Sequence, residues 1–264
     1  MYRQGIGLTL GRQDLNKKRE RRKMSQQVNV NKSLVFGGDA ANTSNVTGNL
    51  SSARMCAVDW FEKDTIDHYT STLGGTNDAI ALVAGGSNGL SLLSGDTDNE
   101  VSFLGTGLIF DISNNPEIEA KVRITDVSQT SFFFGFSDAN TETTPASTID
   151  YADATLAAAA TDAVGFVSDA DKVSSLFYAA SIATGGAVAA VTTGITPTDT
   201  GWYVLRLKVD STGRALFFIN GVAVASVAAA VTDVPLCAVF NFGTRDNGGG
   251  DAVYVKYLKM WQDQ

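Results

Sequence analysis

The chain has 264 residues, a formal net charge of −8, 44% hydrophobic residues and only 18% charged residues. This length suits one large β-domain with an appendage, and the four prolines exclude a collagen-like repeat or a polyproline linker. No apolar stretch approaches the ~20 residues of a membrane span, so no membrane partner is expected. The N-terminus lacks the apolar core of a secretory signal, so we expect a protein that is not exported by the usual route.

Charge is divided unevenly along the chain. Residues 1–23 carry eight Lys or Arg against two Asp or Glu, whereas the remainder carries 12 against 26. Because opposite charges attract, such an arm can bind an acidic protein surface, including a neighbouring copy, or a nucleic acid. Nucleic acid is the less favoured partner, since the run lacks interleaved aromatics and a folded recognition module.

Residues 1–55 are expected to form an extended basic arm and polar linker, because they contain few periodic apolar positions. We expect the arm to be ordered only against a partner, with apolar side chains docking into grooves while the basic ones select the location. The predicted partner-binding residues are Arg3, Ile6, Leu8, Leu10, Arg12, Leu15, Lys17, Lys18, Arg19, Arg21, Arg22 and Lys23.

From Cys56 onward the hydrophobic period changes to two, which predicts half-buried strands. The clearest strand is Glu117–Ile124, whose apolar and charged residues alternate as in an antiparallel sheet with one wet face. Cys56 and Cys237 show no metal-ligand spacing and are interpreted as buried small hydrophobes. Further strands are predicted at Trp60–Thr70, Ala79–Val83, Leu90–Leu93, Val101–Ile112, Thr130–Phe136, Ala163–Val167 and Val173–Ala179.

The C-terminal third predicts a meander of strands. Tight turns at Asp210–Gly213 and Asn220-Gly221 separate them, since Gly and Asn accept the positive φ of hairpin turns. An alanine-rich stretch at Ala152–Ala163 is the one rival helix, although its Thr and Asp favour a loop or a surface turn. The predicted strands are Trp202–Val209, Arg214–Ile219, Val222–Val227, Pro235–Phe242 and Ala252–Trp261. Together these patterns predict an all-β, antiparallel sandwich over residues 56–264.

The run from Gly201 to Asp210, followed by Gly213 and Phe217–Gly221, resembles the concanavalin A-like lectin and glucanase superfamily, a jelly-roll fold. The final strand with Trp261 is also similar to the closing strand of that superfamily. Its hydrolase branch carries a Glu-X-Asp-X-X-Glu strand, which is absent here. Glu117 and Glu119 share a face, but neighbouring Lys121 and Arg123 favour a solvated surface ladder, so we expect no enzyme.

The sandwich, the Phe132–Asp138 strand and the basic arm together resemble, in style, sandwich-domain structural proteins of tailed bacteriophages. That resemblance implies a capsid decoration or cement protein, made in the host cytoplasm and bound at the virion surface to the major capsid protein or another virion protein. Exposed sheet edges favour a homo-oligomer, with a trimer as the first expectation. The alternative is a carbohydrate-binding, lectin-like module of a fibre or spike, using exposed aromatics such as Trp60, Trp202 or Trp261.

Other chemistry receives less support from the residues. His68, the only histidine, is expected on a strand face and has no Gly-X-Ser-X-Gly elbow to complete a triad. Asp96–Glu100 and Asp246–Asp251 cluster carboxylates that could suit calcium, but Asp, Asn and Gly are also ordinary turn residues. The turn interpretation is favoured, so no cofactor or metal is expected.

Overall fold

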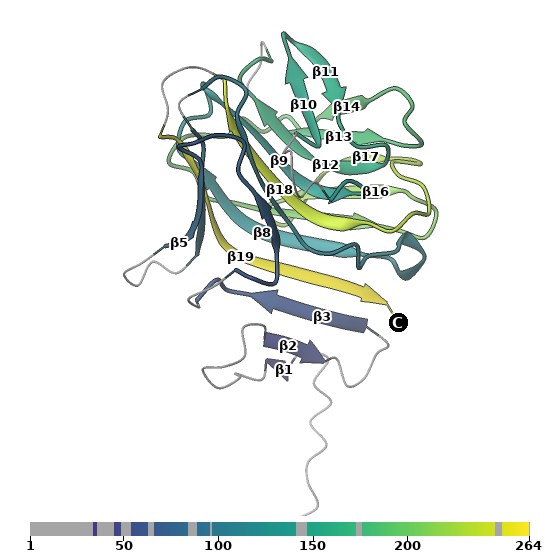
Figure 1. Ribbon diagram of the computed structural model, residues 1–264. Coiled ribbons are helices and arrows are strands. Elements are labelled where there is room, and N and C mark those ends of the chain that lie inside the picture. Colours follow the sequence, from purple (N-terminus) through teal and green to yellow (C-terminus); the bar gives the residue numbers. More distant parts are fainter. Residues whose placement is uncertain are drawn as a thin grey trace, which may run out of the picture. The chain divides into compact units, whose positions relative to one another are not determined.

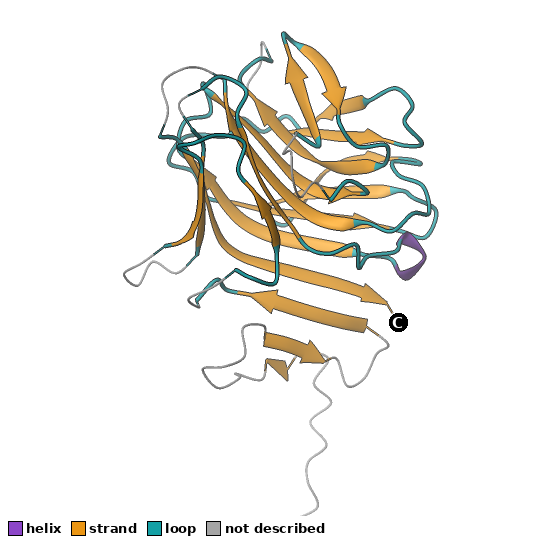
Figure 2. Ribbon diagram, in the orientation of Figure 1, coloured by secondary structure: helices purple, strands orange, loops and turns teal. Residues whose placement is uncertain are grey.

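A computed structural model of the chain describes residues 34–35, 45–48, 54–62, 66–83, 89–95, 97–140, 147–172, 176–245 and 250–263. These residues belong to one compact unit, residues 33–264. Strands dominate it, and a three-residue 3-10 helix, Ile112–Asn114, is the only helix among the described residues (Figure 2). None of the helical structure described is long or apolar enough to cross a membrane.

The larger sheet has ten strands paired antiparallel, in the order β1-β2-β3-β19-β8-β15-β16-β17, with the β5–β6 hairpin joined to β19 through β6. β19 is therefore central, because it pairs with β8 along one side and with β6 and β3 along the other (Figure 1). The bounds are β1 Leu34–Val35, β2 Asn45–Gly48, β3 Arg54–Asp59, β5 Ala79–Leu82, β6 Leu90–Leu93, β8 Glu117–Ile124, β15 Tyr203–Val209, β16 Ala215–Ile219, β17 Val222–Val227 and β19 Ala252–Asp263.

The smaller sheet has seven antiparallel strands in the order β14-β13-β12-β9-β18-β7-β4. A separate two-stranded hairpin is formed by β10 and β11. The bounds are β4 Thr70–Thr72, β7 Val101–Gly105, β9 Thr130–Ser137, β10 Ile149–Ala152, β11 Thr155–Ala158, β12 Ala163–Asp169, β13 Tyr178–Ile182, β14 Ala189–Thr192 and β18 Cys237–Thr244.

The main core lies between the two sheets and uses alternate residues of their strands. β8 buries its even-numbered positions, from Ile118 to Ile124, and leaves the odd-numbered positions on the outer face. Phenylalanines fill the centre, where Phe134 stacks on Phe240 with ring centroids 4.7 Å apart. Burying such a ring stabilises the fold by roughly 1.5–3 kcal/mol. The many buried rings therefore hold the two sheets together.

A second apolar cluster covers the other face of the seven-stranded sheet. Phe133 and Val167 point to this side, where Ile149 and Tyr151 of the β10–β11 hairpin pack over them. Figure 1 shows the hairpin beyond β9 and β12, on the side away from β8 and β19. β9, β12, β13 and β18 are consequently buried along their whole length, and the sandwich has a third layer here.

Glycines allow the central strands of this sheet to approach closely. Gly135 and Gly165 face each other across β9 and β12. A Cβ added to Gly135 would lie 2.1 Å from the carbonyl oxygen of Val164 and 2.5 Å from the Cα of Gly165. No side chain fits there, so this part of the second face is closed by backbone.

Several predicted elements are confirmed by these strands. β8 has the predicted bounds, and β15, β16 and β17 form the predicted meander. Positive φ angles at Gly213, Asn220 and Gly221 occur in the predicted turns. The fold class, an antiparallel β-sandwich, is the expected one.

Other predictions are wrong. The stretch Trp60–Thr70 is not one strand, because β3 ends at Asp59 and β4 begins only at Thr70. Likewise, β7 ends at Gly105, before a loop and the 3-10 helix. The alanine-rich stretch Ala152–Ala163 is not a helix and contains the favoured surface turn, at Asp153 and Ala154 with their left-handed backbone. The strand β11 that follows this turn and pairs with β10 was not predicted.

Strand pairing also begins before the boundary expected at residues 55/56. β1 and β2 lie within the stretch 1–55 that was expected to be an arm and linker, and β2 pairs with β3 over Asn45–Gly48. The physical reason is hydrogen bonding: β2 provides partners for the backbone N–H and C=O groups of β3, and β1 does the same for β2. All twelve predicted arm residues, from Arg3 to Lys23, lie outside the described residues.

Candidate functional site

The outer face of the ten-stranded sheet carries aromatic and charged side chains. Trp202 immediately precedes β15, and its ring lies near Arg123 on β8. Arg123 and Tyr254 on β19 lie on the outer face, since their neighbours in each strand are buried in the core. These three residues are far apart in sequence, and strand pairing brings them together: Arg123 lies opposite Tyr254, and Tyr203 opposite Val122. Pairing therefore creates a site that no single segment contains.

A bulge in β19 shapes this face. The register with β8 shifts between Val255 and Leu258, so Lys256 and Tyr257 together oppose Lys121. A bulge inserts one extra residue and bends the strand, which re-aims the side chains beside it. Lys256 is thereby directed toward the ring of Trp202, with its Nζ atom 5.5 Å from the ring centroid.

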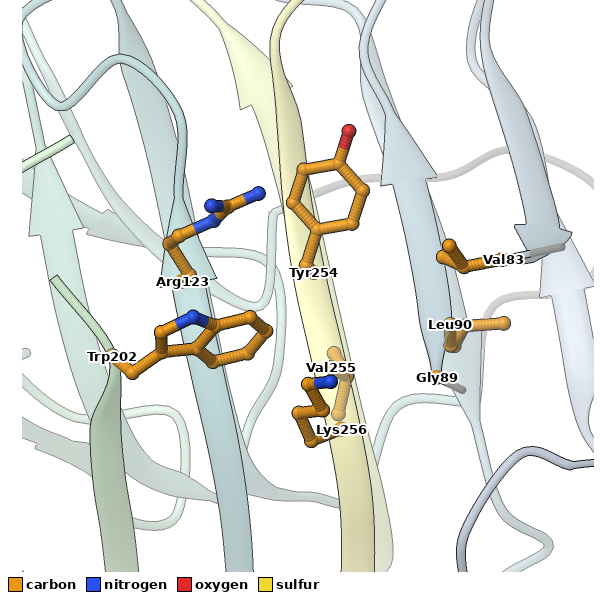
Figure 3. A pocket seen from close by; sticks show the side chains of 8 residues that line it. All are labelled: Val83, Gly89, Leu90, Arg123, Trp202, Tyr254, Val255 and Lys256. Atoms are coloured by element: carbon orange, nitrogen blue, oxygen red, sulfur yellow. The ribbon is translucent and has the colours of Figure 1, made fainter. Parts of the chain in front are cut away.

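These side chains line a pocket of about 400 Å³. Figure 3 shows Tyr254 and Lys256 on β19 between Arg123 and Trp202 on one side and Val83 and Leu90 on the other. The lining residues are Val83, Gly89, Leu90, Arg123, Trp202, Tyr254, Val255 and Lys256. The volume falls at the lower end of the roughly 300–1,000 Å³ typical of small-ligand sites.

Cations surround Trp202. The guanidinium of Arg123 lies 5.3 Å from its ring centroid and 4.7 Å from that of Tyr254, and the Nζ atom of Lys121 lies 5.8 Å from the Trp202 ring. Among the described residues, no acidic side chain lines the pocket. The Nε atom of Arg123 is buried and has no hydrogen-bond partner. The pocket therefore combines aromatic surface with positively charged side chains.

A second aromatic group lies further along β19. Trp60 is 39% exposed and packs against Tyr257 with ring centroids 5.3 Å apart. The Tyr257 hydroxyl donates a 3.0 Å hydrogen bond to Glu119, which also accepts from Lys259 at 2.8 Å. Burial and the nearby Glu119 charge raise the pKa of Tyr257 well above its ordinary value, so the phenol stays protonated as a donor.

The three tryptophans that the sequence nominated thus have different surroundings. Trp202 lies in the pocket, Trp60 packs on Tyr257, and Trp261 is partly buried near the opposite end of β19, paired with Glu117 on β8. None of the three belongs to the buried core. Arg123, Tyr254 and Lys256 were not nominated, because nothing in the sequence places β8 beside β19.

The expected solvated ladder of Glu117 and Glu119 with Lys121 and Arg123 is wrong. Glu117 is only 3% exposed and pairs with Arg206 on β15, while Glu119 pairs with Lys259. Both pairs form across strands: Glu119 lies directly opposite Lys259, and Glu117 reaches Arg206 diagonally, within the range of long side chains. Lys121 and Arg123 are directed instead to the aromatic rings of the pocket.

His68 lies in a turn before β4, so its predicted strand position is also wrong. Its Nε2 atom is 2.9 Å from Asp59, which also accepts hydrogen bonds from the Tyr69 hydroxyl and the Phe61 amide. Burial, followed by the Asp59 charge, raises the pKa of Tyr69 well above its ordinary value. Asp59 thus ties the end of β3 to the turn before β4, which is a structural role.

Buried charge also occurs at the edge of the second apolar cluster. Arg245 donates hydrogen bonds to Asp169 at 2.7 Å and to Asp150 at 2.9 Å, and its side chain is only 4% exposed. Burial raises the pKa of Asp169, an effect that Arg245 opposes. The network links β10, β12 and the end of β18, so it fastens the hairpin over the sheet.

The described residues offer few side chains that could carry thiol chemistry or bind a metal ion. Cys237 is fully buried, as predicted, and burial raises the pKa of its thiol to about 12, which makes it unreactive. The side chain of Cys56 lies outside the description. In the parts of the chain that the structure describes, no cluster of three or more His, Cys, Asp or Glu is arranged to hold a metal ion. Of the two loops considered for calcium, Asp96 and residues 246–249 lie outside the described residues.

Comparison with known proteins supports the fold. The sequence matches no known protein family and none of the curated proteins. Among solved structures, the carbohydrate recognition domain of Emp47p has a TM-score of 0.54 at 10% identity, over 86% of this chain and 100% of that one. A glycoside hydrolase family 16 endo-glucanase from Bacteroides ovatus has a TM-score of 0.54 at 12% identity, and the match covers 77% of this chain and 98% of the endo-glucanase chain. The cellulose-induced protein Cip1 has a TM-score of 0.52 at 13% identity, over 77% and 95%.

These likenesses confirm that the chain has a concanavalin A-like jelly-roll sandwich. Proteins with this fold include a carbohydrate recognition domain and a glycoside hydrolase, as their names state. Because one fold hosts several activities, function has to be argued from the pocket around Trp202.

Proposed function

We propose that this protein binds carbohydrate, and acidic saccharides in particular, in the pocket around Trp202. The observation that carries the proposal is the arrangement of Trp202 and Tyr254 with Arg123 and Lys256 in a pocket of about 400 Å³. An aromatic ring offers an apolar platform to a sugar face, while charged donors beside it select the oxygens of a ligand.

The cations favour an acidic sugar. Outside residues 1–23 the chain carries 12 Lys or Arg against 26 Asp or Glu, so an array of Lys121, Arg123 and Lys256 around one ring stands out from an acidic body. A guanidinium binds carboxylate or sulfate oxygens with two parallel hydrogen bonds. A uronic acid or sulfated sugar stacked on Trp202 would supply the negative charge that the pocket lining lacks.

The layered structure also supports this position for the site. The outer face of the seven-stranded sheet is covered by the β10–β11 hairpin, whereas the pocket on the ten-stranded sheet is open at the surface. The similarity to the carbohydrate recognition domain of Emp47p fits this proposal at the level of fold.

We further propose that binding occurs without hydrolysis. Glu117 and Glu119 share a face but are held in ion pairs with Arg206 and Lys259, and neither lines the pocket. If instead the protein released reducing ends from glycans, and replacing either glutamate abolished this release, the protein would be a hydrolase.

Binding to an array of neutral and acidic oligosaccharides, followed by calorimetry, tests the proposal. We expect Trp202→Ala to weaken binding at least about tenfold, since it removes the platform. Arg123→Gln should weaken acidic ligands about tenfold and neutral ones much less, and added salt should reduce affinity for acidic ligands. Trp261→Ala, on the same sheet but outside the pocket, is the matched control and should bind as wild type. Binding that survives Trp202→Ala would contradict the proposed site.

The capsid decoration role receives no support from the solved structures described above, and it stays a prediction. Electron microscopy of particles carrying this chain would test it directly.

A further inference from the structure

Two carboxylates outside the pocket face each other with no counterion among the described residues. Asp78, just before β5, is 6% exposed, and Glu100 lies just before β7. Oδ1 of Asp78 and Oε2 of Glu100 are buried and have no hydrogen-bond partner. The other oxygen of Asp78 is occupied, because it accepts hydrogen bonds from the Gly74 amide at 2.8 Å and the Gly75 amide at 2.9 Å. Asp78 is thus held in place with one oxygen left unpaired.

The two unpaired oxygens point to the same place. A Cβ added to Gly95 would lie 2.2 Å from Oε2 of Glu100 and 2.8 Å from Oδ1 of Asp78, so these oxygens are at most 5.0 Å apart, the sum of the two distances. A Cβ added to Gly75 would lie 2.0 Å from the same Oε2 atom. The Glu100 carboxylate therefore lies between two glycines, where any other residue would displace it.

From this geometry we propose that Asp78 and Glu100 form a calcium site. Ca²⁺ takes oxygen ligands at roughly 2.3–2.6 Å, so one ion spans two oxygens up to about 5 Å apart. Two carboxylates with buried oxygens this close repel each other, and a divalent cation removes that repulsion while satisfying both unpaired oxygens. Backbone carbonyls of the surrounding loops and water would complete the six to eight ligands that calcium takes.

The site lies where it would fasten the β5–β6 hairpin. Asp78 precedes β5, and Gly95 follows β6 by two residues. The opposite end of this hairpin supplies Val83 and Gly89 to the pocket around Trp202. The calcium site is nevertheless independent of the proposed carbohydrate function. Neither Asp78 nor Glu100 lines the pocket, and calcium binding is measured by thermal unfolding rather than by binding of oligosaccharides.

Thermal unfolding of the full chain, stripped with EDTA and then titrated with calcium chloride, tests the inference. At about 100 times Kd we expect the wild-type midpoint to rise by roughly 5–10 °C, with one calcium per chain by elemental analysis after gel filtration. Asp78→Asn and Glu100→Gln should each abolish most of this rise and the bound calcium. Both variants should fold without calcium, since each removes one member of a repelling pair. Asp153→Asn, an exposed turn residue, is the control and should respond as wild type.

Two outcomes would overturn the site. One is a wild type that neither binds calcium nor shifts its midpoint. The other is an equal shift in wild type and both variants, which would place the ion elsewhere.

Discussion

Both sheets give one face to the common core, and they use their other faces differently. The seven-stranded sheet covers its second face with the β10–β11 hairpin, closely apposed glycines and the buried Arg245 network. The ten-stranded sheet leaves its second face to half-exposed aromatic rings paired with cations. Alternation along the strands does not by itself decide whether the outer face of a sheet is available to a ligand. Availability depends on which other elements cover that face.

The largest loss of stability is expected from replacing Arg245, the buried cation on the face of the seven-stranded sheet that the β10–β11 hairpin covers. Arg245→Met leaves Asp169 buried without its counterion, so we expect a loss of about 3–5 kcal/mol in unfolding free energy, measured by urea denaturation. Adding Asp169→Asn to Arg245→Met should recover part of the loss. Arg214→Met, at an exposed site, should change stability by less than about 0.5 kcal/mol. A similar small change at Arg245 would mean that the network does not hold the hairpin.

Adding one methyl group should also disturb the closed face. Gly135→Ala places a Cβ 2.1 Å from a backbone oxygen that cannot move freely, so we expect a loss of about 1–3 kcal/mol by the same measurement. Gly107→Ala, where the nearest atom lies 3.6 Å from the new Cβ, should be close to neutral. Equal effects at the two glycines would contradict the close approach of β9 and β12.

An arginine on the open face sharpens the comparison. Arg206 pairs with the buried Glu117, as Arg245 pairs with Asp169, but its side chain is 40% exposed rather than 4%. Because solvent screens the pair, Arg206→Met should cost only about 1 kcal/mol. High salt should reduce the cost at Arg206 and leave the cost at Arg245 nearly unchanged. If Arg206→Met and Arg245→Met lowered the free energy of unfolding equally, burial of the arginine would not explain the difference between the two outer faces.

The smallest effect is expected at a turn that belongs to neither face. Asp210 accepts hydrogen bonds from the Thr212 hydroxyl and from the amides of Thr212 and Arg214, and these bonds lower its pKa. A lowered folded-state pKa adds stability above the ordinary Asp pKa, which is lost as the pH falls through the lowered value. Asp210→Asn should therefore cost about 0.5 kcal/mol at pH 7 and almost nothing at pH 2, by urea denaturation. A cost that does not depend on pH would assign the effect to shape rather than charge.

Sequence patterns predicted the elements that local rules control. β8 alternates cleanly, and Gly213 and Asn220-Gly221 are turn residues, so these strands were found with little error. The β10–β11 hairpin was missed because its Thr and Asp favour a loop or a surface turn and its alanines favour helix, while its strand conformation depends on the apolar surface beneath it. Periodicity carries no information about that surface.

The pocket and the carboxylate pair were predicted less completely for a similar reason. Trp202 was nominated as an aromatic, but Arg123 and Tyr254 join it only through the pairing of β8 with β19. Glu100 was noticed within an acidic loop, whereas its partner Asp78 lies 22 positions away and becomes a neighbour only when β5 and β6 pair. Long-range register decides such sites, and single segments do not encode it.

The central position of β19 has a consequence for how the chain is made. β19 follows all other described strands in the sequence, yet it joins β3 and β6 to β8. While the ribosome is still adding residues 252–263, the flanking strands have no partner between them and expose unpaired hydrogen-bonding groups. The ten-stranded sheet can therefore close only after residues 252–263 have been made, so a chain truncated before residue 252 would be prone to aggregation and would not be a smaller stable protein.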